Sequence, residues 1–153
     1  MDILTFNLKP FKNLFYAVLA VSVLATLAAY VAGANVFSIV LLRDDNLSET
    51  RGLLLLLIVA AVLQTAYQKK LLKKPRSMTD LEAQATLYLN IYKQRLYWKC
   101  GSCLVSCFIH LLTGRNIFLY FAIFDVATTW TYFPNKALMR KELNCEEVLF
   151  IED

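Results

Sequence analysis

Charged side chains are scarce in this sequence: they make up 18% of its 153 residues, whereas 58% of the residues are hydrophobic. A soluble domain has about a quarter charged residues and less than half apolar ones. Glycine is also scarce, with four residues, and no glycine-rich phosphate loop is present. The sequence lacks a nucleophile–base set, a nucleic-acid-binding motif and a Gly/Ser linker. These absences argue against a soluble enzyme and against a nucleic-acid partner.

Long uncharged runs occupy most of the chain instead. A helix rises about 1.5 Å per residue, so roughly 20 apolar residues cross the hydrocarbon of a bilayer. Runs such as the leucines and isoleucine at 53–58 lack the alternation of barrel strands, and a helix satisfies its backbone groups internally. We therefore predict an all-α integral membrane four-helix bundle, with residues 1–153 forming a single transmembrane domain. The predicted spans are 14–34, 52–68, 97–113 and 116–133.

The distribution of lysine and arginine predicts the orientation. Of the sixteen basic residues, all but Arg43, Arg51 and Arg115 fall on one side of the predicted spans. This bias predicts that the N- and C-termini are cytoplasmic, with a cytoplasmic connection at 69–96 and a cytoplasmic tail at 134–153. The first span also resembles a signal peptide that ends at the small residues 32–34, but its apolar stretch exceeds the typical 7–15 residues. We therefore expect the first span to stay in the protein as a membrane anchor.

Local signals predict that the third helix extends into the cytoplasm. Pro75 should end the second helix, and Thr79-Asp80-Leu81-Glu82 reads as a capping box. Neither glycine nor proline follows until Gly101. The third helix should therefore start near residue 80 and continue into the membrane. The short connection at 113–116 predicts an antiparallel hairpin with the fourth helix.

Asp125 is the only charged residue within the apolar runs 14–34, 52–68, 100–114 and 116–135. Counting inward from the outer ends of the spans at about 1.5 Å per residue puts it at the level of Gln64, Ser106 and Thr26, and Thr128 follows on its own helical face. We predict a polar midplane layer of these five residues, without a basic partner in the spans. Such a layer favours structural bonding between helices. The alternative is a proton or cation site.

The cysteines suggest a further alternative. Cys100 and Cys103 form a C-x-x-C pair, which is a candidate redox pair when one thiol is activated. Their predicted place at the cytoplasmic membrane edge argues against this role, because thiols stay reduced there. The single histidine, His110, lies about two turns from Cys103, so we expect no metal site, and we expect no cofactor.

Two other patterns indicate contacts. Small residues recur at helical spacing in the first span, which allows close helix packing within this chain or with a second copy; they are Ala25, Ala29 and Gly33. A basic run should attract anionic lipid headgroups, or serve only to fix the topology. The run consists of Lys69, Lys70, Lys73, Lys74 and Arg76.

From residue 92 onward the chain resembles a family of small, uncharacterised four-span proteins of Bacteroidota. The resemblance rests on Tyr92-Lys93, on the loop Leu111-Leu112-Thr113-Gly114-Arg115-Asn116, on Pro134-Asn135-Lys136 and on Lys141-Glu142-Leu143-Asn144. Family members often carry a glutamate near the position of Leu104, where this chain departs from them. The resemblance implies a multi-pass protein of a bacterial inner (cytoplasmic) membrane, and no mechanism.

The sequence as a whole favours a non-enzymatic accessory or scaffold subunit. Its expected partners are the lipid bilayer and either another membrane protein or a second copy in a homo-oligomer. The alternative is a small oligomeric proton- or cation-coupled transporter or channel that uses Asp125. The third hypothesis is a thiol redox enzyme that uses Cys100 and Cys103.

Overall fold

The computed structural model describes residues 5–34, 47–77, 81–143 and 149–151. The described part is almost entirely helical, as predicted. Two three-residue strands depart from the all-α expectation, and they pair in parallel with Thr5 opposite Leu149. The elements are β1 (Thr5–Asn7), α1 (Lys9–Ala34), α2 (Leu47–Leu71), α3 (Lys73–Arg76), α4 (Leu81–Thr113), α5 (Asn116–Thr129), η1 (Trp130–Tyr132), α6 (Lys136–Leu143) and β2 (Leu149–Ile151).

Three of the described helices are long and apolar enough to cross a membrane: Lys9–Gly33, Thr50–Pro75 and Glu82–Thr113. The prediction of a helical chain with membrane-crossing helices is confirmed to this extent. The fourth predicted span, 116–133, is divided between α5, with 14 residues, and the 3-10 helix η1, with three. The helix α5 alone is about 21 Å long at 1.5 Å per residue.

Glycine and proline mark the ends of helices. Gly114, at the end of α4, has a φ of 64°, in the left-handed region that glycine adopts without strain. Its N–H donates to the His110 carbonyl at 2.8 Å, and α5 begins two residues later. Pro75 has no N–H to donate to the carbonyl of Leu71, where α2 ends.

The predicted continuous third helix is confirmed. The helix α4 has 33 residues, from Leu81 to Thr113, and no proline interrupts it. Thr79 and Asp80, which form the start of the predicted capping box, lie outside the described residues.

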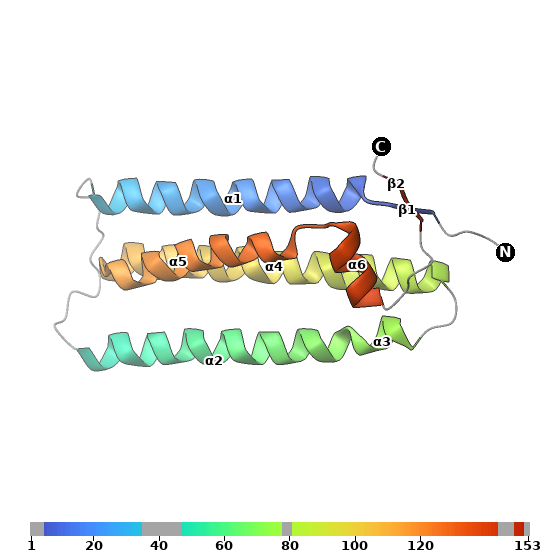
Figure 1. Cartoon of the computed structure of the whole chain (residues 1–153). Helices are drawn as coiled ribbons and strands as arrows, with labels where there is room; N and C mark the ends of the chain where they lie inside the picture. The colour runs from blue at the N-terminus through green and yellow to red at the C-terminus, as the bar shows by residue number, and fades with distance from the viewer. Residues whose placement is uncertain (1–4, 35–46, 78–80, 144–148, 152–153) are drawn as a thin grey trace.

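The helices α1, α4 and α5 pack together along their lengths, and α4 and α5 lie between α1 and α2 (Figure 1). Two apolar clusters form the core. The smaller one, between α1, α4 and α5, consists of Ala29, Cys103, Cys107, Leu119 and Ala122. The larger one, at the end where β1 and α6 lie, consists of Leu8, Phe11, Phe15, Val18, Leu72, Tyr88, Ile91, Tyr92, Leu96, Met139 and Leu143.

The helix α2 contributes little to this core. None of its most apolar 18-residue window is buried, and Leu55 is 66% exposed. Its contacts concentrate at the end next to α3, where Gln68 and Leu72 are buried. Among the described helices, α1, α4 and α5 thus pack tightly together, and α2 joins them mainly at one end.

Candidate functional site

The helix α4 carries two basic residues one turn apart, Arg95 and Lys99, and each has an acidic partner on a different helix. Nη1 of Arg95 lies 2.8 Å from both carboxylate oxygens of Glu142 on α6. Nζ of Lys99 lies 3.0 Å from Oδ1 of Asp125 on α5. The exposed fractions of all four side chains are at most 15%. Ion pairs this deeply buried interact strongly, because little water screens them.

The first pair belongs to a polar cluster that attaches α6 to α4. The hydroxyl of Tyr88 donates to Oε2 of Glu142 at 2.6 Å, and the guanidinium of Arg95 lies 4.8 Å from the centre of the Tyr132 ring. The hydroxyl of Tyr92 donates to the Tyr132 carbonyl at 2.8 Å. These contacts explain how a charged pair can lie next to the larger apolar cluster: each charge has hydrogen-bonding or π partners.

Sequence reasoning missed the partnership of Arg95 with Glu142. It counted Arg95 among the topology-determining basic residues, and Glu142 entered only through the family resemblance. The two are 47 residues apart, so no local pattern links them. One signal was available: Tyr88, Tyr92 and Arg95 recur at helical spacing, which indicates a single polar and aromatic stripe on α4.

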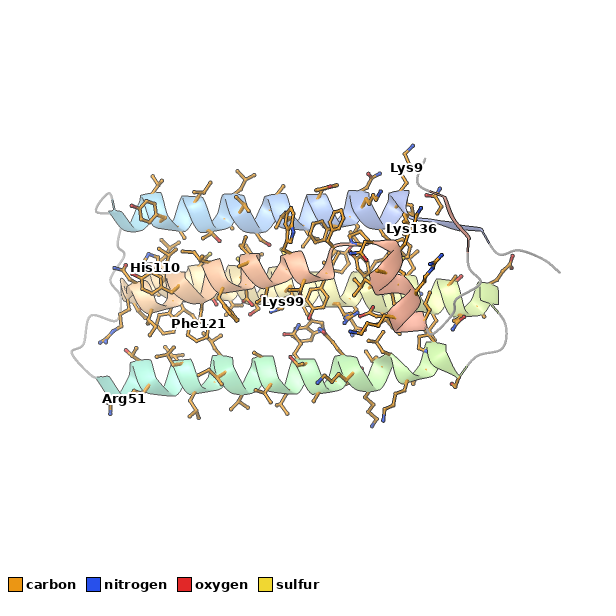
Figure 2. All side chains as sticks on the ribbon, viewed as in Figure 1. Lys9, Arg51, Lys99, His110, Phe121 and Lys136 are labelled. Carbon is orange, nitrogen blue, oxygen red and sulfur yellow. The ribbon has the colours of Figure 1, made fainter. Side chains whose placement is uncertain are left out.

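The second pair corrects the expectation that Asp125 has no basic partner in the spans. Its Oδ2 accepts from Ser102 at 2.6 Å, and Nζ of Lys99 also donates to Thr128 Oγ1 at 3.1 Å. Lys99 lies midway along the bundle in Figure 2. Its long aliphatic stem carries the ammonium group from the α4 backbone to α5, which a count of residues along the helix axis does not reveal.

The residues predicted to form one polar midplane layer make separate contacts in the structure. Asp125 and Thr128 contact Lys99, whereas Oγ1 of Thr26 lies 3.4 Å from Sγ of Cys103. Gln64 lines a cavity between α2 and α4. Ser106 is buried, with 1% of its surface exposed, but the Asp125 carboxylate bonds the serine one turn earlier, Ser102.

The C-x-x-C pair consists of free thiols. Cys100 is half-buried and Cys103 is buried. The thiol of Cys103 points between α1 and α5, where it donates weakly to the carbonyls of Ser22 and Ala122 at 3.7 and 3.8 Å. Its surroundings are those of a small residue that fills a contact between helices. Among the described residues, no group of three histidine, cysteine or acidic side chains is placed to hold a metal ion.

The small-residue stripe of α1 faces other helices of this chain. Ala25 and Ala29 pack in the smaller apolar cluster. A Cβ at Gly33 would lie only 2.6 Å from Nε2 of His110, so glycine is required for this approach. Nδ1 of His110 lies 3.1 Å from the Arg115 carbonyl, which links the end of α1 to the α4–α5 loop.

Basic residues gather at the end of the bundle that holds α3, β1 and α6. Lys9 and Lys136 lie at this end, and Arg51 and His110 lie at the other (Figure 2). The lysines of the basic run, Lys69, Lys70, Lys73 and Lys74, are exposed. Arg76 belongs to α3 at the same end.

Comparisons with known protein families, with curated proteins and with solved structures find no match. The resemblance to the Bacteroidota family therefore stays a prediction, and the function has to be inferred from the chain itself.

Proposed function

We propose that this chain is a non-enzymatic accessory or scaffold protein of a bacterial inner membrane, and that α2 packs against another membrane protein or a second copy. The observation that carries the proposal is the unpacked membrane-length helix α2. Leu55, Leu56, Val62 and Leu63 of α2 are each more than 60% exposed. At about 100° per residue, these four positions lie within about a third of the helix circumference and form one exposed apolar face. None of the most apolar 18-residue window of α2 is buried by its own bundle.

A groove next to α2 favours a helical partner. Its volume is about 520 Å³, and its walls include Ala61 and Thr65 of α2 and Phe121 and Phe124 of α5. Phe121 lies on the side of α5 that faces α2 (Figure 2). Small residues four positions apart, as Ala61 and Thr65 are, permit the close approach of another helix. Lipid chains would cover the leucines equally well but do not require this spacing.

We further propose four spans with cytoplasmic ends. The pairing of β1 with β2 joins the two ends of the described chain, which supports an even number of crossings. The helices α5 and η1 together are about 27 Å long at 1.5 and 2.0 Å per residue, close to the ~30 Å hydrocarbon thickness. The excess of basic residues at the β1–β2 end supports its cytoplasmic location.

The pairing of Asp125 favours a structural role over transport. Both of its carboxylate oxygens are engaged, one by Lys99 and the other by Ser102, so the carboxylate bonds α5 to α4. The alternative function, an oligomeric proton- or cation-coupled transporter or channel, is favoured by one feature of the same contact. Paired lysine and acidic side chains inside membrane proteins also occur in proton pathways.

Photo-crosslinking in native membranes tests the proposal. A photoreactive residue replaces Leu55 on α2 in one variant and Leu24 on α1 in the control, because each leucine is 66% exposed. We expect a discrete protein product from position 55, either with another membrane protein or with a second copy, and only lipid adducts from position 24. Equal, diffuse lipid labelling from both positions would refute an α2 interface.

A further inference from the structure

A second cavity lies between α2 and α4, and two amide nitrogens on its wall have no hydrogen-bond partner within the described part of the chain. Its volume is about 310 Å³. The α2 wall includes Leu63, Gln64, Tyr67 and Gln68, and the α4 wall includes Arg95 and Trp98. The leucine and the two aromatic rings make most of this surface apolar, so the cavity suits a molecule with both an apolar and a polar part.

Gln68 is the most informative residue of the cavity. It is only 6% exposed, and its Oε1 accepts from Nε of Arg95 at 3.4 Å. Because the arginine can only donate, this contact fixes the oxygen toward Arg95 and directs the amide nitrogen elsewhere. Within the described part of the chain, Nε2 of Gln68 is buried and has no hydrogen-bond partner.

Gln64, one turn earlier on α2, has a similarly placed amide group. Its Nε2 is also buried without a partner among the described residues, and it lines the same cavity. Buried amide donors are almost always paired in folded proteins. Two unpaired donors on one wall therefore indicate a ligand with acceptor oxygens.

Nearby lysines restrict the ligand further. Arg95 on the wall is already paired with Glu142, so the positive charge that would attract an anion comes from Lys69 and Lys70, which are exposed and directly follow Gln68 on α2. Tyr67 and Trp98 are residue types that concentrate at the headgroup level of a bilayer. At about 30 Å³ per water molecule, the volume corresponds to roughly ten waters, which accommodates the polar part of one lipid and the start of a chain.

We propose that this cavity binds one anionic phospholipid, whose ester or phosphate oxygens accept hydrogen bonds from Gln64 and Gln68. The acyl chains continue along the apolar surface of α2 into the bilayer. This site is distinct from general attraction of headgroups to the lysine run, since it requires two specific amides. It is independent of the protein partner proposed for α2.

Native mass spectrometry of the full chain tests the site. The protein is reconstituted in nanodiscs of phosphatidylglycerol or of phosphatidylcholine and then released. We expect one phosphatidylglycerol to stay bound per chain, at least tenfold more strongly than phosphatidylcholine. Replacing both amides, Gln64→Leu with Gln68→Leu, should weaken phosphatidylglycerol retention about tenfold or more, since two hydrogen bonds are lost.

The matched control is Thr65→Val on the same helix. Its hydroxyl bonds the Ala61 carbonyl at 2.8 Å and lies outside this cavity, so lipid retention should not change. A second variant, Ala60→Phe, fills the cavity without altering any polar group and should also lose the lipid. It tests the site independently if the double variant fails to fold.

Three results would overturn the proposal. Full retention by Ala60→Phe would place the lipid elsewhere. If the folded double variant retains phosphatidylglycerol fully, and neutralising Lys69 and Lys70 releases it, the lipid is held only by general attraction of its headgroup to the lysines. If phosphatidylcholine is retained as strongly as phosphatidylglycerol, the site does not select an anionic lipid.

Discussion

Gly33 and Gly52 lie in opposite environments near the same end of the bundle. A Cβ at Gly33 would lie 2.6 Å from Nε2 of His110, whereas a Cβ at Gly52 would meet nothing within 4 Å. The His110 ring cannot retreat easily, because it is 3% exposed and its other nitrogen contacts the Arg115 carbonyl. The same substitution at the two glycines therefore has opposite consequences.

We predict that Gly33→Ala destabilises the protein by about 1–3 kcal/mol through overpacking. Gly52→Ala should be neutral or stabilising by up to about 1 kcal/mol, because alanine is the better helix former. Equilibrium unfolding in mixed detergent–SDS micelles measures both. Adding His110→Ala should relieve the overpacking at position 33. A Gly33→Ala variant as stable as Gly52→Ala would show that α1 does not approach His110 this closely.

Glu142 gives a second prediction at this scale. Glu142→Gln removes the counter-charge of Arg95, whose guanidinium it contacts at 2.8 Å, and leaves a buried cation. We expect a loss of about 3–5 kcal/mol and faster amide exchange along α6, measured by hydrogen–deuterium exchange. Tyr88→Phe removes one hydrogen bond to the same carboxylate and should cost about 1.5–3 kcal/mol.

The double variant Arg95→Met with Glu142→Leu serves as the control for this pair. It removes both charges and should recover much of the lost stability, since apolar replacements of a buried pair are often neutral. A double variant as unstable as Glu142→Gln would mean that shape, and not the unpaired charge, determines the loss.

At the scale of elements, the Lys99–Asp125 contact joins the two helices of the α4–α5 hairpin. Asp125→Asn keeps an acceptor for Ser102 but leaves the Lys99 ammonium without its counter-charge. We predict a loss of about 3 kcal/mol in the free energy of unfolding. The control Thr128→Val removes a neutral hydroxyl, which accepts from Lys99 and donates to carbonyls of its own helix, and should cost about 0.5–1.5 kcal/mol.

The same Asp125 variant separates the two candidate functions. A scaffold loses stability on this change, and the combination Lys99→Met with Asp125→Leu should restore it. If Asp125→Asn instead unfolds like the wild type but abolishes proton flux in liposomes, the transporter alternative replaces the structural one.

The elements also show what the sequence could and could not reveal. The absence of glycine and proline between 81 and 100 predicted the unbroken helix α4, and the short loop around Gly114 predicted its hairpin with α5. Both signals are local. The partner of Asp125 was missed because counting residues gives depth along a helix axis but not the facing direction or the reach of a lysine side chain. The Arg95–Glu142 contact was missed because the two residues are 47 positions apart in the sequence, and no local pattern places α6 next to α4.

At the scale of the whole molecule, the β1–β2 pairing bears on the number of membrane crossings. Thr5–Asn7 pairs with Leu149–Ile151, so the two ends of the described chain meet. If α1, α2 and α4 cross the membrane and α5 does not, residues 9 and 136 must lie on opposite sides. The pairing then has to break, because polar backbone cannot reach across hydrocarbon without partners.

Cysteine labelling in spheroplasts distinguishes the two topologies. In a chain whose four native cysteines are replaced by alanine, Arg51→Cys should react with a membrane-impermeant maleimide in intact spheroplasts. Lys9→Cys and Lys136→Cys should react only after lysis if the basic end of the bundle faces the cytoplasm, as we propose. Labelling of Lys136→Cys without lysis, with Lys9→Cys still protected, would mean that α5 does not cross. The chain would then have three spans, and the contact of Lys99 with Asp125 would have to form at the membrane surface.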